Sequence, residues 1–146
     1  MGGYVLMSIK PVFAEEILSG FKKYELRSFI GSIGSGDLVV LYASSPLKAI
    51  VGKFVAGRSW TTSFSDVVRL VREGVLEGVT KRDLEFMAGR KRRLLVIEVL
   101  NPARFPRPVS LSEVRRHVPG FRPPMSYYKV REGTPLANYL NALLRG

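Results

Sequence analysis

Short strand-like runs alternate with short helical segments along this chain, and this spacing limits the folds that the chain can adopt. Six segments have the continuous apolar or alternating character of β-strands, namely residues 4–9, 24–27, 38–43, 49–60, 94–100 and 126–130. Their spacing lacks the tandem strand–helix–strand units of a parallel sheet. We therefore expect an α+β fold in which five or six strands form a small mixed sheet or partly open barrel with short helices at its periphery.

Helices are predicted where apolar residues recur at helical spacing between turn signals. These segments run from Pro11 to before Gly20, from Ser63 or Ser65 through Val71, from an N-cap at Thr80 to Met87, and from 135 to 144. Residues 101–124 hold most of the prolines, so we expect a long irregular segment there with a short helix at 112–117. The expected core positions are Ile9, Leu26, Val39, Leu41, Val96, Ile97 and Leu100, with Tyr139, Leu140 and Leu143 docking the last helix.

Length and composition exclude several classes of protein. The 146 residues fit one domain, 1–146, with a core at about 4–130 and a C-terminal helix at about 135–144. There is no cysteine and only one histidine, which excludes disulfide frameworks, thiolate nucleophiles and metal sites built on cysteine or on two histidines. We therefore expect no metal and no cofactor.

The same composition bears on where the protein resides. No apolar run approaches the roughly 20 residues that cross a bilayer, and the N-terminus lacks the basic region and cleavage site of a signal peptide. The sequence thus predicts a soluble, cytoplasmic protein with no membrane partner. Glutamine is absent and charged residues are frequent, a composition that is typical of thermophiles.

Positive charge is concentrated in one part of the chain. The net charge is +11, and residues 89–131 alone carry 11 basic and two acidic side chains. Solubility does not require such an imbalance, so we interpret it as a sign of a polyanionic partner, of which nucleic acid is the commonest in the cytosol. A generally basic proteome is the alternative explanation.

Glu25 lies among basic residues and has two interpretations. On a strand, Lys23, Glu25 and Arg27 share one face, with Lys22 beside them. They can form a ladder of surface ion pairs, worth less than about 1 kcal/mol. Alternatively, they line a cleft in which Glu25 orients the basic groups or acts as a base.

Aromatic and basic residues also interleave at 122–129, which reads RPPMSYYK. Adjacent side chains on a strand point to opposite faces, so one of Tyr127 and Tyr128 can join the core while the other stacks on a base. Packing of both tyrosines in the core is the alternative.

Several of these segments together resemble the ASCH domain, a family of the PUA-like superfamily. Residues 8–14, SIKPVFA, are similar to the strand and helix that open the family, and residues 20–27, GFKKYELR, are similar to its G-x-K-x-x-E-x-R motif. Residues 42–46, YASSP, and 122–127, RPPMSY, resemble segments of an archaeal branch whose members are labelled predicted transcriptional regulators. The resemblance spans about residues 4–130.

The resemblance implies a PUA-like pseudo-barrel with a cleft lined by the opening motif, and RNA binding or chemistry on RNA. A bacterial branch deacetylates acetylated cytidine with a lysine, a threonine and a glutamate. The lysine matches Lys22, whereas the threonine falls on Glu25, which is no hydroxyl nucleophile. The glutamate belongs to the helical middle region, where Glu73 and Glu77 are candidates.

The sequence therefore indicates two alternative functions. As an RNA-binding protein, or with DNA as a further partner, it would regulate transcription or translation. The residues expected to bind are Lys10, Lys22, Lys23, Arg27, Ser44, Ser45, Arg122, Ser126, Tyr127 and Tyr128, with added affinity from 90–93. As a hydrolase, it would use Lys22 and Glu25 for acid–base chemistry on a modified nucleoside, or would act as a ribonuclease in which Lys10, Lys22 and Arg27 stabilise phosphate charge.

Overall fold

The computed structural model describes residues 3–145 as six strands and five helices. The strands are β1 (Tyr4–Ile9), β2 (Tyr24–Ser28), β3 (Leu38–Ala43), β4 (Ala49–Thr62), β5 (Leu94–Ser110) and β6 (Tyr127–Val130). The helices are α1 (Pro11–Leu18), α2 (Phe64–Arg72), α3 (Lys81–Met87), α4 (Leu111–His117) and α5 (Pro135–Arg145). Within residues 3–145, no helix combines the length and the apolar character needed to cross a membrane.

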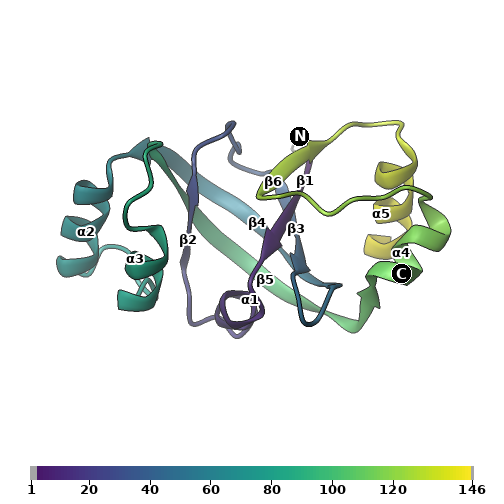
Figure 1. Cartoon of the computed structure of the whole chain (residues 1–146), viewed down its shortest axis with the longest axis horizontal. Coiled ribbons are helices and arrows are strands. Elements are labelled where there is room, and N and C mark those ends of the chain that lie inside the picture. The colour runs from purple at the N-terminus through teal and green to yellow at the C-terminus, as the bar shows by residue number, and fades with distance from the viewer. Residues whose placement is uncertain (1–2, 146) are drawn as a thin grey trace.

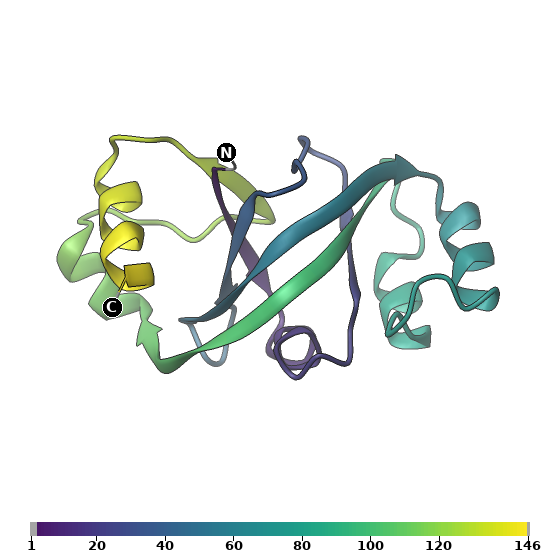
Figure 2. The ribbon, with the colours of Figure 1, turned by 180° about the vertical axis from the view of Figure 1, so that it is seen from behind.

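All six strands belong to one mixed sheet in the order β2-β5-β4-β3-β1-β6. β1 and β3 are parallel, and the other neighbouring pairs are antiparallel. The long strands β4 and β5 cross the whole molecule, with α2 and α3 at one end and α4 and α5 at the other (Figure 1). Seen from behind, the same two strands form a diagonal between the two helix pairs (Figure 2). The predicted α+β class and mixed sheet are confirmed.

The sheet curls until its two edges meet through side chains. The register between β4 and β5 shifts at three places, and such bulges bend and twist a strand pair. At the edges, Arg27 at the end of β2 donates to the hydroxyl of Ser126, 3.0 Å away, just before β6. The Tyr127 hydroxyl donates to the carbonyl of Gly31 at 2.6 Å and accepts from the backbone of Ile30. The result is the pseudo-barrel that the resemblance implies.

The buried apolar side chains form three clusters, one inside the curled sheet and one beneath the helix pair at each end of the molecule. The central cluster fills the curl beneath α1, a second lies under α4 and α5, and a third lies between the sheet and α2 and α3. Six of the seven predicted core positions of the sheet are buried, namely Ile9, Leu26, Val39, Leu41, Val96 and Ile97. Leu140 is also buried and is flanked by Tyr139 and Leu143, so the docking of the last helix is confirmed.

Leu100 is the exception, since its side chain is 40% exposed and the core prediction for it is wrong. β2 pairs with β5 only as far as Glu98, so Leu100 lies beyond the end of the strand that would cover it.

The irregular segment predicted at 101–124 is also partly wrong. Residues 101–110 continue β5 and pair with the first half of β4, for example Ala103 with Lys53 and Val109 with Ile50. Because the pairing of β2 with β5 ends at Glu98, this half of β5 is an edge strand, and an edge tolerates prolines that cannot donate hydrogen bonds. The short helix after it is confirmed as α4, and residues 118–124 are irregular as expected. The closing strand predicted from residue 126 begins one residue later, at Tyr127.

Candidate functional site

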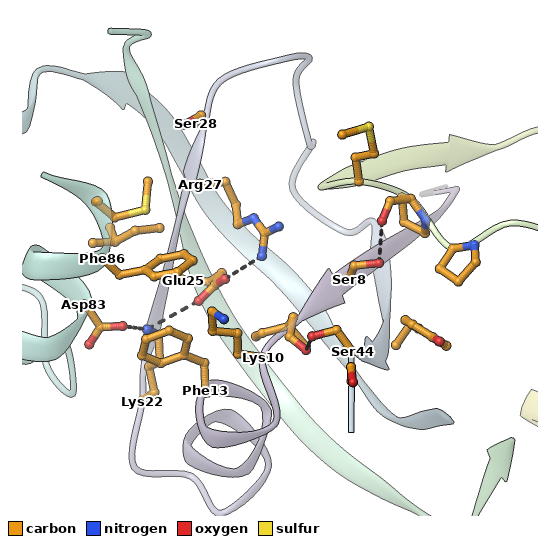
Figure 3. A pocket seen from close by; sticks show the side chains of 18 of the residues that line it. Ser8, Lys10, Phe13, Lys22, Glu25, Arg27, Ser28, Ser44, Asp83 and Phe86 are labelled. Atoms are coloured by element: carbon orange, nitrogen blue, oxygen red, sulfur yellow. Dashed lines mark hydrogen bonds and ion pairs between the residues drawn. The ribbon is translucent and has the colours of Figure 1, made fainter. Parts of the chain in front are cut away.

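A cleft of about 420 Å³ opens between the two halves of the curled sheet. Its walls come from the end of β1, α1, β2, the turn after β3, α3 and the segment at 123–125. Figure 3 shows Asp83 and Phe86 on one side, Ser8 and Ser44 on the other, and Glu25 and Arg27 between them. Segments far apart in the sequence thus meet at one site.

Four alternating charges form the floor of the cleft. The Lys22 ammonium contacts the carboxylate of Asp83 and lies 3.4 Å from Oε1 of Glu25. The other oxygen of Glu25, Oε2, lies 3.1 Å from Nη1 of Arg27. Lys22 and Glu25 are only 1% and 3% exposed. Glu25 therefore belongs to a buried network that shapes a cleft, and the surface ladder is excluded.

Lys22 is held in place by the backbone on either side of it. After α1 ends, the Lys22 amide donates to the Glu16 carbonyl at 2.9 Å, and the Lys23 amide donates to the Glu77 carbonyl at 3.0 Å. Gly78 passes so close that a Cβ there would lie 2.2 Å from the Phe21 carbonyl oxygen, and its φ is +86°. Only glycine fits this approach and this backbone conformation. The loop that carries Lys22 is thus clamped against the segment before α3.

Asp83 is positioned by the start of α3. Its carboxylate accepts from the Thr80 amide at 2.8 Å and from the Thr80 hydroxyl at 3.3 Å, which completes a capping box. The same carboxylate contacts Lys22, so one side chain both begins the helix and neutralises a buried cation. Sequence reasoning identified the cap but missed the second role.

One wall of the cleft consists of aromatic rings and cations. Phe86 projects from α3 and is 43% exposed, with its ring edge-on to Phe13 at a centroid distance of 5.6 Å. Lys10 and Arg90 lie 5.6 and 5.0 Å from the centre of the Phe86 ring. Lys22 lies 4.7 Å from the centre of the Phe13 ring. Contacts of this kind orient the cations by their attraction to the ring face.

The opposite wall is polar with an apolar rim. The Ser8 hydroxyl donates to the Pro124 carbonyl at 2.6 Å, and the Ser44 hydroxyl donates to the Ile9 carbonyl at 3.3 Å. Met125 lines the rim, and its side chain is fully exposed. A ligand between the walls would meet hydroxyl groups below and apolar surface at the mouth.

The lining has a positive charge balance. Five cations line it, Lys10, Lys22, Arg27, Lys48 and Arg90, against the two carboxylates of Glu25 and Asp83. Both carboxylates already pair with Lys22 or Arg27, whereas no carboxylate in residues 3–145 lies within 4.0 Å of Lys10, Lys48 or Arg90. An anionic ligand would therefore find three cations free to bind it.

The cleft brings together only part of the predicted site. Lys10, Lys22, Glu25, Arg27, Ser44 and Ser45 line it. Five other predicted residues do not, namely Lys23, Arg122, Ser126, Tyr127 and Tyr128. Ser126 lies just behind the floor, where it accepts from Arg27. Lys23 and Arg122 are exposed elsewhere on the surface.

Both tyrosines of the predicted pair pack against apolar clusters and donate hydrogen bonds from their hydroxyl groups to backbone carbonyls. Tyr127 is buried, and its hydroxyl bonds the backbone of Ile30 and Gly31. Tyr128 packs against the second apolar cluster, and its hydroxyl donates to the Arg122 carbonyl at 2.9 Å. Burial raises the pKa of Tyr128 above its usual value. The alternative in which both tyrosines pack against the core describes them better than a split between core and cleft.

Two further expectations concern acidic residues and metals. Glu73 bonds Arg69 on the surface of α2, and Glu77 is exposed, so neither candidate from the helical middle region lies in the cleft. Asp83 is the acidic residue from that region that does. Within residues 3–145, no three histidine or acidic side chains cluster as metal ligands.

Three lining residues escaped sequence reasoning or were assigned elsewhere. Phe86 is the half-exposed aromatic residue of the cleft, and its place in the helical pattern of α3 gave no sign of a surface role. Lys48 follows a turn with no motif of its own. Asp83 lies in the first turn of the helix predicted from the N-cap at Thr80, and its sequence context pointed to no further function.

Comparison with known proteins finds similar solved structures but no similar sequence family. No protein-family model matches the chain, and no curated protein matches it. Among solved structures, ASCH from Zymomonas mobilis is similar over 97% of this chain and 95% of its own, with a TM-score of 0.81 and 20% sequence identity. A hypothetical protein from Leishmania major has a TM-score of 0.60 at 15% identity and covers 99% of this chain and 96% of its own. The N-terminal domain of McrB from Staphylothermus marinus has a TM-score of 0.58 at 15% identity, covering 100% and 96%. The chain shares the fold of these proteins over nearly its full length.

Proposed function

We propose that this protein is an ASCH-domain protein that binds single-stranded RNA in the cleft. Two independent lines support the family. The opening motif from Ser8 to Arg27 resembles that of ASCH domains, and the fold matches that of the Zymomonas mobilis ASCH protein with a TM-score of 0.81. The charged residues Lys10, Lys22, Glu25 and Arg27 of that motif also line one cleft, which supports a functional role for it.

The observation that carries the proposal is the combination of free cations and an exposed aromatic ring. Lys10 and Arg90 lie on the Phe86 ring and pair with no carboxylate of residues 3–145, while the two acidic groups of the cleft are already neutralised. Single-stranded nucleic acid is recognised by such pairs of features, since cations bind phosphates and aromatic faces stack on bases.

We assign Phe86 as the stacking residue in place of Tyr127 or Tyr128. Its ring is accessible from the cleft, whereas the hydroxyl groups of both tyrosines are bonded to the backbone. Lys10 and Arg90 then contact phosphates beside the stacked base. Arg27, Ser44 and Ser45 face the same space and supply hydrogen bonds to the base or sugar.

The test is a titration of fluorescent single-stranded RNA at several salt concentrations. Each phosphate contact on a single strand contributes about −0.7 to the slope of log affinity against log salt. Lys10→Ala should lower both the affinity and the slope, whereas Lys129→Ala, which removes an exposed charge from β6, should change neither by a comparable amount. Weak binding that is insensitive to salt contradicts the proposal, and DNA and duplex RNA of the same sequence identify the preferred partner.

A second candidate is a hydrolase acting on a modified nucleoside such as acetylated cytidine, or on RNA. It is favoured by the contact between Lys22, which matches the lysine of the deacetylating branch, and Asp83 from the helical middle region. It is disfavoured by Glu25, which stands where that branch has a threonine and lies 3.4 Å from the Lys22 ammonium. We therefore rank it second.

The resemblance to the archaeal branch also suggests a cellular role. We propose that RNA binding serves the regulation of transcription or translation in the cytoplasm. A change in transcript levels or in translation when the gene is deleted, reversed by the wild-type protein and not by a Phe86→Ala variant, would support this role.

A further inference from the structure

A second hollow lies directly beside the cleft, between the turn after β3 and α4. Its lining includes Leu47, Lys48, Leu111, Arg115 and Arg116. Lys48 and Leu111 line both the hollow and the cleft, so the two spaces share a wall. The Leu111 amide donates to the Lys48 carbonyl at 2.9 Å, which ties the turn to the start of α4.

The hollow is positively charged. Lys48, Arg115 and Arg116 line it, and no acidic side chain does. The acidic residue of α4, Glu113, is held by two hydrogen bonds from Arg107 of β5, at 3.1 and 3.3 Å. That bonding, with the nearby charge of Arg116, lowers the pKa of Glu113 below its usual value. Its negative charge is therefore already paired with a cation of β5.

The charge of the hollow extends to the cleft wall. Arg115 donates through Nε to the Phe121 carbonyl at 3.0 Å, which fixes its guanidinium beside α4. Its positive charge acts on Tyr42, which lines the cleft, although burial is the stronger influence and raises the pKa of Tyr42. On the far side of the cleft, residues 90–93 are all basic, and Arg90 lines the cleft itself. Cations thus flank the cleft on both sides.

We infer that a nucleic-acid strand with one base in the cleft continues across this hollow, where its next phosphates bind Lys48 and Arg116. The inference rests on the proposed function and extends its site from the cleft to α4, which Figure 1 places at the opposite end of the molecule from α3. Leu47 is 57% exposed beside these cations and offers an apolar surface to a sugar or an unpaired base. The combination of cations with accessible apolar side chains fits a single strand, whose bases are not already stacked in a duplex.

The experiment compares short and long oligonucleotides on one double variant and its control. Single-stranded RNAs of about three and about ten nucleotides distinguish a cleft-only site from a longer track. The variant is Lys48→Asn with Arg116→Ala; asparagine suits position 48 because Lys48 has a φ of +51°. The control, Lys129→Ala with Arg131→Ala, removes the same charge from exposed residues outside both spaces.

We expect the double variant to lose more affinity for the long RNA than for the short RNA, because Lys48 lines both spaces whereas Arg116 lines only the hollow. Equal losses for the two lengths would overturn the track. The salt slope of the double variant for the long RNA should fall by about 1.4, because two single-strand phosphate contacts of about 0.7 each are lost. Equal slopes for the double variant and its control, with Lys10→Ala still weakening binding, would overturn the track and leave the cleft site intact. Failure of the wild type to bind either RNA would overturn the proposed function and the track together.

Discussion

Lys22 and Asp83 are separated by 61 residues in the chain and are in direct contact at the floor of the cleft. This contact joins the loop after α1 to the start of α3, and α3 carries Phe86 on the cleft wall. Both side chains are buried, so neither charge is hydrated. Their stability inside the protein depends on their contact with each other and on the neighbouring hydrogen bonds. The geometry of the cleft therefore depends on a charged pair and not only on apolar packing.

Asp83→Asn should destabilise the protein markedly. The change removes one of the two carboxylates beside the buried Lys22 ammonium and leaves only Glu25. It also weakens the cap of α3. Breaking a buried ion pair typically costs about 3–5 kcal/mol of stability. Urea unfolding followed by circular dichroism measures the difference. Glu73→Gln, which breaks an exposed pair with Arg69, is the control and should cost about 0.5 kcal/mol or less. A loss below about 1 kcal/mol for Asp83→Asn would show that the pair is dispensable.

Phe86→Ala should weaken RNA binding without unfolding the protein. Stacking of a base on an aromatic ring is worth about 1–3 kcal/mol, so affinity should fall by roughly 5- to 150-fold. Phe21→Ala removes another exposed ring, one outside the cleft, and should leave affinity almost unchanged. Fluorescence anisotropy with the same RNA compares the two. Equal affinities for both variants would remove Phe86 from the site.

The sequence predicted the elements of the fold where local signals and pairing agree. Residues 38–43 form a continuous apolar run, and they are a central strand with neighbours on both sides. The prolines of 101–110 predicted an irregular segment, yet this segment is a strand. It pairs with β4 on one side only, so backbone N–H donors are needed on that side and prolines are tolerated where the backbone faces away from β4. Local propensity does not reveal whether a strand has one neighbour or two.

The candidate site shows the same limit. The motif from Ser8 to Arg27 identified Lys10, Lys22, Glu25 and Arg27 correctly as neighbours, because they lie on consecutive elements. Asp83, Phe86 and Lys48 come from other segments, and only the closure of the sheet brings them to the cleft. Their roles depend on tertiary contacts that no spacing within the sequence encodes.

Leu41→Ala should cost about 2–5 kcal/mol through the loss of buried contacts and the cavity that remains. The side chain of Leu41 is fully buried in the central cluster, between the sheet and α1. Leu100→Ala deletes the same atoms from a side chain that is 40% exposed, and it should cost less than about 1 kcal/mol. Thermal and urea unfolding of both variants check the contrast. Similar losses in the two would contradict the burial that distinguishes them.

The pair formed by Glu15 and Arg104 predicts a pH dependence. Two hydrogen bonds from Arg104, at 2.8 and 2.5 Å, hold the pKa of the Glu15 carboxyl below its usual 4.5. Since the pKa is lower in the folded state than in the unfolded state, the pair stabilises the fold above the unfolded pKa, and this contribution is lost as the pH falls through the folded pKa. A carboxyl titration by NMR should show a normal pKa for Glu15 in Arg104→Ala and no change for Glu113. A normal value in the wild type would contradict the pair in solution.

The Glu25→Gln variant distinguishes the two proposed functions, RNA binding and hydrolysis. Both oxygens of Glu25 already face cations, Oε1 towards Lys22 and Oε2 towards Arg27, so neither is directed at a substrate alone. Glutamine keeps the size of the side chain but loses the charge, so binding of RNA should change by a small factor because contacts to phosphate dominate affinity. A general base would instead lose about 10²–10⁴ in rate. We expect little or no turnover of acetylated cytidine or of a mixed RNA pool by the wild type. Clear turnover by the wild type that Glu25→Gln abolishes, while RNA binding persists, would make the hydrolase the first of the two proposed functions. Urea unfolding of the variant checks that the loss of turnover is not a loss of folding.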